Sequence, residues 1–343
     1  MTGRPTISDI AREAEVSVAT VDRVLNGRHP VREETARRVY DAATAIGYHA
    51  VGLIRQRLQP DLKPYRLGFV LQKPRQFFYQ QFARELEIAA RAATGMRIEV
   101  HIDFTDSQAA VDIIAKLREV AARCQAVAMA GPDHPLLTDA VQELRDNGTP
   151  VFSLLSDFAS GVREGYVGLN NRKAGRTAGW MIAKTARRPG KVAVFVGSHR
   201  FHGHELREIG FRAFLRENAA DFQVLDTLIN LETRQITHEA TLDLLQRHPD
   251  LVGLYIAGGG MEGAISALRE ENAAGRIVAV CNELTPESRA ALADGVVTAV
   301  VATPLPRLCA ELMAMMARTI DSGAAETPGQ TFLPFELYVS ENI

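Results

Sequence analysis

The sequence predicts an α/β protein in which a small all-α helix-turn-helix domain precedes two doubly wound parallel-sheet lobes. Two short capped helices are expected near the N-terminus, and apolar β-rich runs alternate with helical patterns from residue 65 onward. A length of 343 residues, 46% of them hydrophobic and 23% charged, suits two or three compact units. The predicted domains are 1–49 for the helix-turn-helix, 50–64 for a hinge or linker, and 65–343 for the two-lobed region.

Residues 6–26 contain two predicted helix starts. Ser8 and Ser17 each precede an apolar run at helical spacing, and a serine hydroxyl in that place accepts an N–H from the first helical turn. Each short helix carries one apolar stripe, so the two stripes are expected to pack on each other. A third helix is predicted to begin at 31–34 and to stop at Gly47. This layout is that of a helix-turn-helix that reads DNA in the major groove.

The second helix is expected to present its outer face to DNA. Arg23 is the predicted reader of base edges, and Val18 and Ala19 are predicted to make apolar contacts with thymine methyl groups. Ser17 and Thr20 are expected to hold phosphate or to cap the helix. The alternative for this segment is a small helical bundle that binds no nucleic acid.

Several motifs resemble the LacI/GalR family of bacterial repressors over residues 1–58: Thr-Ile-Ser-Asp-Ile-Ala, Val-Ser-Val-Ala-Thr-Val and Arg-Val-Leu-Asn-Gly, then Val-Arg-Glu-Glu-Thr and Ile-Gly-Tyr. The resemblance implies a hinge helix that forms on DNA and inserts a leucine into the minor groove. Arg57 stands at the expected leucine position, so Leu53 and Leu58 both remain candidates, and an ordinary linker is the alternative. The residues expected to contact DNA are Ser8, Ser17, Val18, Ala19, Thr20, Arg23, Asn26, Leu53, Arg57 and Leu58.

Composition and charge argue against a membrane, secreted or disulfide-rich protein. The formal net charge is −2, and no apolar stretch is long enough to span a bilayer. The N-terminus carries polar residues where a secretory signal needs apolar ones, so a cytoplasmic protein without a membrane partner is expected. Cys124, Cys281 and Cys309 are widely spaced without a Cys-x-x-Cys motif, which indicates reduced thiols in the core and neither disulfides nor a zinc site.

Strands and helices alternate through the rest of the chain. The predicted strands are 66–71, 98–102, 126–130, 150–154, 192–196, 223–228, 253–256, 277–280 and 298–301, with a further strand at the end of the sequence. A crossing at 166–171 divides them into two lobes. This region resembles the type I periplasmic sugar-binding fold, which the LacI/GalR family fuses to its DNA reader. Ligands of such sheets bind at the carboxyl ends of the strands.

Candidate effector contacts therefore follow the predicted strands. In related sugar-binding proteins an aromatic pair stacks on the sugar ring, which points to the run 77–79, and Arg207 lies in a family-like Arg-x-x-Gly-aromatic motif where a guanidinium reaches hydroxyls or a carboxylate. The glycine run 258–260 could hold an anion or an oxygen-rich ligand through backbone N–H groups. The full predicted set is Arg75, Phe77, Phe78, Tyr79, Ser156, Asp157, Arg207, Gly259, Asn282, Glu283 and Thr303.

Signs of an enzyme are scarce. The glycine run does not have Gly-x-Gly-x-x-Gly spacing, and no Gly-x-Ser-x-Gly elbow, Walker loop or His-Glu-x-x-His occurs. The spacing of the histidines at 199, 202 and 204 would allow them to bind a metal. The preferred interpretation is a loop at the edge of the cleft, in which one histidine bonds the effector. We therefore expect no catalytic residues, no cofactor and no metal.

The predicted function is a ligand-responsive transcriptional regulator, a repressor of a sugar or polyol catabolic operon. The sequence ends without a leucine heptad tail, so a homodimer on a pseudo-palindromic, double-stranded operator is expected, with a sugar, polyol or sugar derivative as effector. Whether the ligand releases or promotes DNA binding stays open. The alternatives are a constitutive DNA-binding protein with a vestigial cleft, and a binding module or enzyme that merely carries a helical N-terminus.

Overall fold

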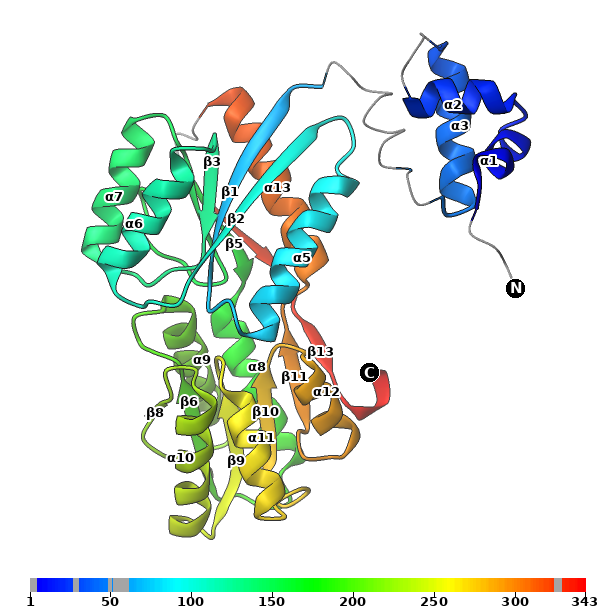
Figure 1. Ribbon diagram of the computed structural model, residues 1–343. Helices are drawn as coiled ribbons and strands as arrows, with labels where there is room; N and C mark the ends of the chain where they lie inside the picture. Colours follow the sequence, from blue (N-terminus) through cyan, green and yellow to red (C-terminus); the bar gives the residue numbers. More distant parts are fainter. Residues whose placement is uncertain (1–4, 27–30, 49–50, 52–61, 324–328) are drawn as a thin grey trace. The chain divides into compact units, whose positions relative to one another are not determined.

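The computed structural model describes residues 5–26, 31–48, 51, 62–323 and 329–343. Its contacts divide the chain into two compact units, one of residues 1–64 with 93–97 and one of residues 65–92 with 98–343 (Figure 1). In the part of the chain that is described, no helix has the length and apolar character needed to cross a membrane.

In the described part of the N-terminal unit, three helices pack around one small core. They are α1 (Ile7–Glu13), α2 (Val18–Asn26) and α3 (Glu33–Ala45). Gly47, with a φ of +68°, follows α3 as predicted. Their apolar stripes meet in a cluster of ten buried side chains: Ile10, Ala11, Ala14, Val21, Val24, Leu25, Ala36, Val39, Ala42 and Ala43. The Arg38 guanidinium donates to the Ala14 carbonyl oxygen over 2.6 Å and so ties α3 to the turn between the first two helices.

The two helix starts differ in their caps. Ser17 caps α2 as predicted, because its Oγ accepts the Thr20 N–H over 3.1 Å. The prediction for α1 was wrong: Thr6 is the N-cap, and Ser8 lies inside the helix, exposed. The Thr6 Oγ1 accepts the Asp9 N–H over 3.4 Å, and the Asp9 carboxylate accepts the Thr6 N–H over 2.9 Å. This reciprocal capping box satisfies two N–H groups that a helix start leaves open.

Replacing Thr6 with alanine is expected to destabilise α1 by about 1 kcal/mol, because the Asp9 N–H loses its acceptor. Hydrogen exchange of the α1 amides in the whole protein measures this as a roughly fivefold acceleration. Ser8→Ala is the matched control and should leave exchange unchanged. A larger effect from Ser8→Ala than from Thr6→Ala would contradict the cap assignment.

The second unit consists of two α/β lobes. The N-terminal lobe contains β1 (Pro64–Gln72), α5 (Phe77–Ala92), β2 (Arg97–Thr105), α6 (Ala110–Ala121), β3 (Ala126–Met129), α7 (Pro135–Asp146), β4 (Val151–Leu154), β5 (Gly165–Leu169), α13 (Leu305–Ser322) and β12 (Gly329–Leu333). Its sheet has the order β12-β5-β4-β3-β1-β2. Helices α6 and α7 cover one face of this sheet, and α5 and α13 cover the other (Figure 1).

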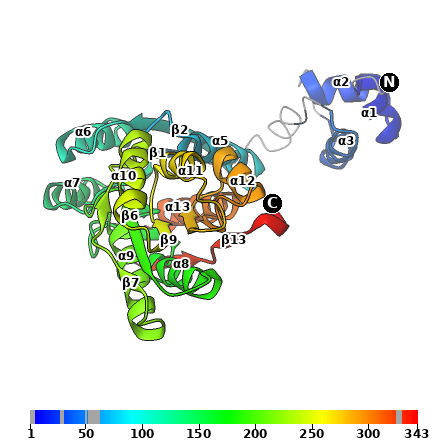
Figure 2. The ribbon, with the colours of Figure 1, turned by 90° about the horizontal axis from the view of Figure 1, so that it is seen from below.

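The C-terminal lobe repeats this plan. It contains α8 (Asn171–Thr185), β6 (Lys191–Val196), α9 (His202–Asn218), β7 (Gln223–Val224), β8 (Leu228–Ile229), α10 (Arg234–Arg247), β9 (Leu251–Ile256), α11 (Met261–Glu270), β10 (Val278–Asn282), α12 (Pro286–Ala293), β11 (Ala299–Ala302), β13 (Glu336–Tyr338) and the 3₁₀ helix η1 (Ser340–Asn342). The sheet order is β13-β11-β10-β9-β6-β7, with β8 also on β6. Helices α8 and α9 pack on one face, and α10, α11 and α12 on the other (Figure 2).

Most predicted strands are present within a residue or two of their predicted bounds, and three segments differ. The predicted crossing at 166–171 contains a buried strand, β5, before α8 begins. The predicted strand 223–228 is two short strands that pair separately with β6. Strand β12, which pairs in parallel with β5, was not predicted. Parallel pairing joins segments far apart in the chain, so the local pattern of β12 does not reveal it.

Candidate functional site

The exposed face of α2 is the candidate DNA interface. Val18 is 49% exposed, and Ser17, Ala19, Arg23 and Asn26 are also exposed, whereas Thr20 is half-buried. The opposite face of the helix is held in the core. The Asn26 amide donates to Asp22 over 2.6 Å, and the Ser17 and Thr20 hydroxyls share a hydrogen bond of 2.8 Å. The three predicted hinge contacts, Leu53, Arg57 and Leu58, lie outside the described residues.

A cavity of about 80 Å³ lies between the two lobes of the second unit, at the carboxyl ends of the strands. The N-terminal lobe contributes a largely apolar, uncharged wall: Gln76, Phe77, Phe78, Tyr79, Ala130, Leu155 and Ser156. The C-terminal lobe contributes the charged groups and most of the polar ones: Phe201, Gly203, His204, Arg207, Glu232, Gly258, Gly259, Met261, Glu262, Asn282, Glu283 and Thr285. The cavity therefore combines aromatic rings on one side with hydrogen-bonding groups on the other.

Arg207, from α9, is buried and lines the polar wall of the cavity. Its Nε donates to the Asn171 Oδ1 over 2.7 Å, and its Nη1 donates to the Ala257 carbonyl oxygen over 2.8 Å. Two glycines set its position, because α8 and α9 pack closely: a Cβ on Gly175 would lie 1.8 Å from the Arg207 carbonyl oxygen, and one on Gly210 2.1 Å from the Arg172 carbonyl oxygen. The close crossing of these helices holds the guanidinium at the cavity.

Asn282 ends strand β10 and Glu283 follows it, and both line the cavity. Glu283 has a φ of +70°, and its carboxylate accepts both the N–H and the hydroxyl of Thr303 over 2.8 Å each. Burial raises the pKa of Glu283, although Arg207 and Thr303 oppose the shift. The Asn282 amide is already paired within the protein, since it accepts the Tyr255 hydroxyl over 2.8 Å and donates to the Val301 carbonyl oxygen over 3.2 Å. Glu283 therefore keeps more acceptor capacity for a ligand than Asn282 does.

The backbone N–H of Gly259 was predicted to hold an anion or oxygen-rich ligand. The protein supplies an acceptor itself, because the Gly259 N–H donates to the Glu232 Oε1 over 3.2 Å. Burial favours the neutral acid, but His204, Lys73 and this N–H outweigh it and lower the pKa of Glu232. Burial also lowers the pKa of His204 to about 4, so its ring is neutral at neutral pH. Lys73 is then the cation that balances Glu232.

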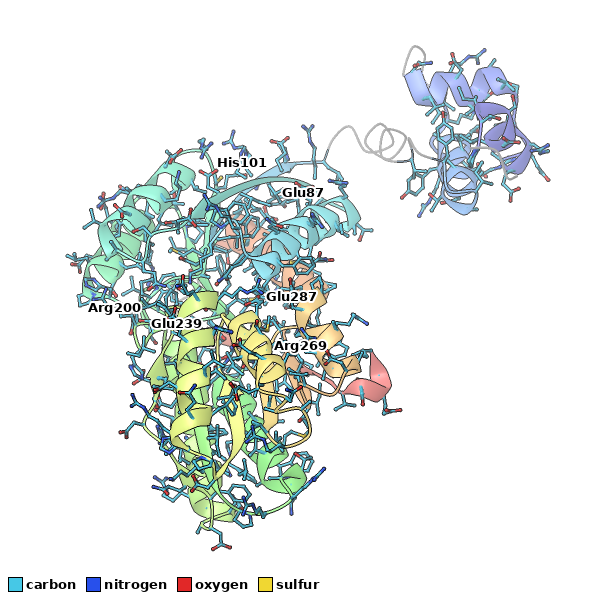
Figure 3. The ribbon with its side chains drawn as sticks, turned by 60° about the horizontal axis from the view of Figure 1, so that its bottom comes forward. Glu87, His101, Arg200, Glu239, Arg269 and Glu287 are labelled. Atoms are coloured by element: carbon cyan, nitrogen blue, oxygen red, sulfur yellow. The ribbon has the colours of Figure 1, made fainter. Side chains whose placement is uncertain are left out.

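Lys73 and Glu232 join the two lobes beside the cavity. The Lys73 Nζ lies 3.1 Å from the Glu232 carboxylate and 2.7 Å from the Leu231 carbonyl oxygen, and the Gln76 amide donates to the Glu232 carbonyl oxygen over 3.2 Å. Lys73, Leu231 and Glu232 all have positive φ, between 44° and 54°, a backbone region that costs such residues energy. A second contact joins the lobes where the Asp133 N–H donates to the Arg200 carbonyl oxygen; Arg200 is labelled in Figure 3. These contacts hold the lobes together around the cavity.

Replacing Lys73 with methionine is expected to open this junction, because it leaves the buried Glu232 carboxylate without a cation. Breaking a buried pair by removing one partner costs about 3 kcal/mol or more. If local opening becomes easier by this amount, the Gly259 amide exchanges roughly 100-fold faster. Hydrogen exchange measures the change. The double variant Lys73→Met with Glu232→Gln should recover much of the protection, and unchanged exchange in the single variant would show that the ion pair does not hold the lobes.

Eight predicted effector residues line the cavity, and three do not: Arg75, Asp157 and Thr303. Arg75 is exposed. Asp157 is buried in an ion pair with Arg163, which is 2% exposed, at an Nε–Oδ1 distance of 2.5 Å. Thr303 lies behind Glu283 and holds its carboxylate. The last two serve the protein's own hydrogen bonding at strand ends, where the sequence pattern predicted ligand contacts.

Several lining residues were missed, chiefly Gln76, Glu232, Glu262 and Thr285. Glu232 follows β8 and precedes α10, so an acidic residue between a strand and a helix was the available signal. Glu262 follows the glycine run after Met261, and Gln76 directly precedes the aromatic run. Of the three clustered histidines, His199 pairs with Glu208 and His202 with Glu205, and only His204 lines the cavity. Among the described residues, no group of three or more His, Cys, Asp or Glu side chains is placed to hold a metal ion.

Two family models match the chain. The model of the Periplasmic binding protein domain matches residues 67–324, and the model of Bacterial regulatory proteins, lacI family, matches residues 6–50. Among relatives, the HTH-type transcriptional regulator GalS of Salmonella typhimurium is 25% identical over 276 residues, covering 78% of this chain and 76% of its own. An uncharacterized HTH-type transcriptional regulator of Streptomyces limosus is 27% identical over 275 residues, covering 78% of this chain and 74% of its own. Catabolite control protein A of Staphylococcus aureus is 37% identical over 82 residues, 24% of each chain.

Solved structures share the fold of the two lobes. GanP, a glucose-galactose binding protein from Geobacillus stearothermophilus, has a TM-score of 0.71 and 21% identity, covering 82% of this chain and 99% of its own. A periplasmic solute binding protein from Actinobacillus succinogenes with bound D-allose has a TM-score of 0.73 and 16% identity, covering 81% and 98%. The lacI-family match covers the helical N-terminal unit, and the periplasmic-binding-protein match covers the two lobes. The protein therefore belongs to the LacI/GalR family of DNA-binding transcription regulators, which are not enzymes, and carries a helix-turn-helix followed by a periplasmic-binding-protein domain.

Proposed function

We propose that this protein is a cytoplasmic repressor that binds a pseudo-palindromic operator as a homodimer and responds to a sugar, polyol or sugar derivative in the cavity between its lobes. The observation that carries the proposal is the cavity itself. In this cavity an aromatic wall of one lobe lies opposite Arg207 and Glu283 of the other. The same chain carries α2, whose outer face is exposed. Aromatic rings cover the apolar face of a sugar, while a guanidinium and a carboxylate bond its hydroxyls.

The ligand acts through the relative position of the lobes. A ligand that contacts both walls favours the closed arrangement, and it changes operator affinity by the difference between its affinities for the two arrangements. Paired hinge segments of a dimer would pass this change to the DNA, with Leu53 or Leu58 entering the minor groove. Two-fold symmetry of the dimer matches the symmetry of the operator.

A constitutive DNA-binding protein is the second candidate function. Ser156 and Asn282 favour it, because both line the cavity while bonded within the protein: the Ser156 hydroxyl accepts the Gly203 N–H over 3.0 Å, and Asn282 bonds Tyr255 and Val301. A gel-shift titration on DNA from the protein's own upstream region, with random competitor and a pooled sugar and polyol extract, separates the two. A specific band that responds to the extract supports the repressor; a specific band that never responds supports the constitutive protein.

Replacing Arg23 with alanine is expected to cost about 1 to 3 kcal/mol at the operator and little on random DNA, because a base-reading guanidinium discriminates between sequences. Arg37→Ala, an equal change of charge at an exposed site on α3, is the control and should weaken both kinds of binding slightly. Equal losses on operator and random DNA for Arg23→Ala would show that this side chain does not read bases.

A further inference from the structure

Among the described residues, one carboxyl group in the cavity wall has no side-chain partner, although its own backbone N–H lies close to it. Glu262 lies in the first turn of α11, partly buried, and the described part of the chain offers it neither an ion pair nor a hydrogen bond from another side chain. Burial raises the pKa of this carboxyl. The other two carboxyls of the wall differ, since Glu232 pairs with Lys73 and both oxygens of Glu283 accept from Thr303. Glu262 is therefore free to bind a ligand.

The charges around the cavity leave a surplus of carboxylate. Burial raises the pKa of Glu283 and Arg207 opposes this shift, while Lys73, which lies beside the cavity wall, balances Glu232. Among the described lining residues, no further Lys or Arg is left to face Glu262. Exposed Arg234 on α10 and exposed Glu287 on α12 act on Glu262 in opposite directions, and Glu287 is labelled in Figure 3. An anionic ligand would be repelled here, and a cationic ligand would supply the missing partner.

The backbone N–H before α11, where an anionic ligand would bind, already donates to a carboxylate of the protein. The Gly259 N–H precedes α11, where backbone donors and the helix dipole attract negative charge, and it donates to Glu232. A sugar acid or a sugar phosphate would have to displace a carboxylate that is also paired with Lys73. The cavity therefore disfavours anionic ligands for a second, independent reason.

The opposite wall adds an attraction for cations. Phe77, Phe78 and Tyr79 line the cavity, and the rings of Phe78 and Tyr79 meet edge to face with centroids 5.2 Å apart. Aromatic faces attract ammonium groups, and carboxylates pair with them. Resting on the repressor function proposed above, we propose that the effector is a polyhydroxylated amine, an amino sugar or aminocyclitol, and that Glu262 selects its ammonium group.

Matched ligands test the proposal on the full-length protein. Isothermal calorimetry compares D-glucosamine, D-galactosamine and D-mannosamine with the parent hexoses, the N-acetylated amines and the corresponding uronic acids. At least one amine is expected to bind at least tenfold more tightly than its neutral parent, with no binding of its N-acetyl form or its uronic acid. The isosteric variant Glu262→Gln should reduce the ratio of amine affinity to neutral-parent affinity from at least tenfold to less than twofold.

Glu287→Gln is the matched control, because it makes the same change of charge outside the cavity wall and should keep the preference for amines. Circular dichroism and operator binding verify that both variants are folded. Tighter binding of a neutral or acidic sugar, unaffected by Glu262→Gln, would overturn the amine proposal and leave the effector cavity in place. If no compound of the panel binds, and if operator binding is intact but does not respond to the pooled extract, then both the amine effector and the ligand-responsive repressor are overturned.

Discussion

Replacing Gly175 with alanine is expected to lower the free energy of unfolding of the two-lobed unit by about 3 kcal/mol, the upper part of the range for overpacking a core. The new Cβ would lie 1.8 Å from the Arg207 carbonyl oxygen and 2.7 Å from its carbonyl carbon. Both are backbone atoms of a helix, so no side chain can rotate away, and α8 and α9 must separate. Urea denaturation followed by circular dichroism measures the loss.

The same change should also weaken effector binding, because moving α9 shifts the Arg207 guanidinium away from Asn171 and Ala257. Gly329→Ala is the matched control, since a Cβ there meets nothing within 4 Å and the glycine does not need a positive φ. An equal stability for Gly175→Ala and Gly329→Ala would show that the two helices do not cross as closely as described.

Replacing Asp157 with alanine is expected to cost about 3 to 5 kcal/mol of stability, because it leaves a buried guanidinium without its counter-charge. Arg163 donates to both carboxylate oxygens of Asp157, over 2.5 and 2.7 Å, and Ser153 and Gln330 also donate to this carboxylate. Asp157 does not line the cavity, so effector affinity measured at a temperature where the variant is folded should stay unchanged. A loss of affinity with normal stability would restore Asp157 as a ligand contact.

The pH dependence of this contribution has a definite sign. Burial alone would raise the pKa of Asp157, but the hydrogen bonds from Arg163, Ser153 and Gln330 outweigh it and lower the pKa. The unfolded state therefore binds the proton more readily, so the contribution is present above the unfolded pKa of about 3.9 and disappears as pH falls through the folded pKa. The variant and the natural protein should converge in stability at acid pH. The double variant Asp157→Leu with Arg163→Met should regain part of the loss at neutral pH.

The local pattern of the sequence predicted most of the elements. Helix caps, apolar periodicity and turn residues act between neighbours in the chain, so the three N-terminal helices, the Ser17 cap and the stop at Gly47 could be read directly. Ser8 and Thr6 compete within one turn for the same role, and the capping box with Asp9 decides in favour of Thr6. The sequence could show a helix start there but not which hydroxyl caps it.

The ends of the predicted strands indicated where the cavity would lie. The aromatic run, Arg207 and Glu283 line it. The pattern could not separate residues that face the cavity from those bonded behind it. Thr303, just after strand β11, donates to Glu283, and Gln330 donates to Asp157 from 173 residues further along the chain. A polar residue at a strand end can contact a ligand or bond within the protein, and only its partners in space distinguish the two.

The sequence by itself determined the two-part architecture, the helix proposed to read DNA and the edge of the sheets at which a ligand would bind, because each depends on caps, periodicity and motifs within short segments. The tertiary structure alone decided which polar groups are already satisfied and which remain open. Glu232 meets Lys73 from the other lobe and Asn282 is bonded within its own lobe, whereas no described side chain pairs with Glu262. The physical reason is that hydrogen bonds and ion pairs join atoms that are close in space, and their partners here lie on segments distant in the chain.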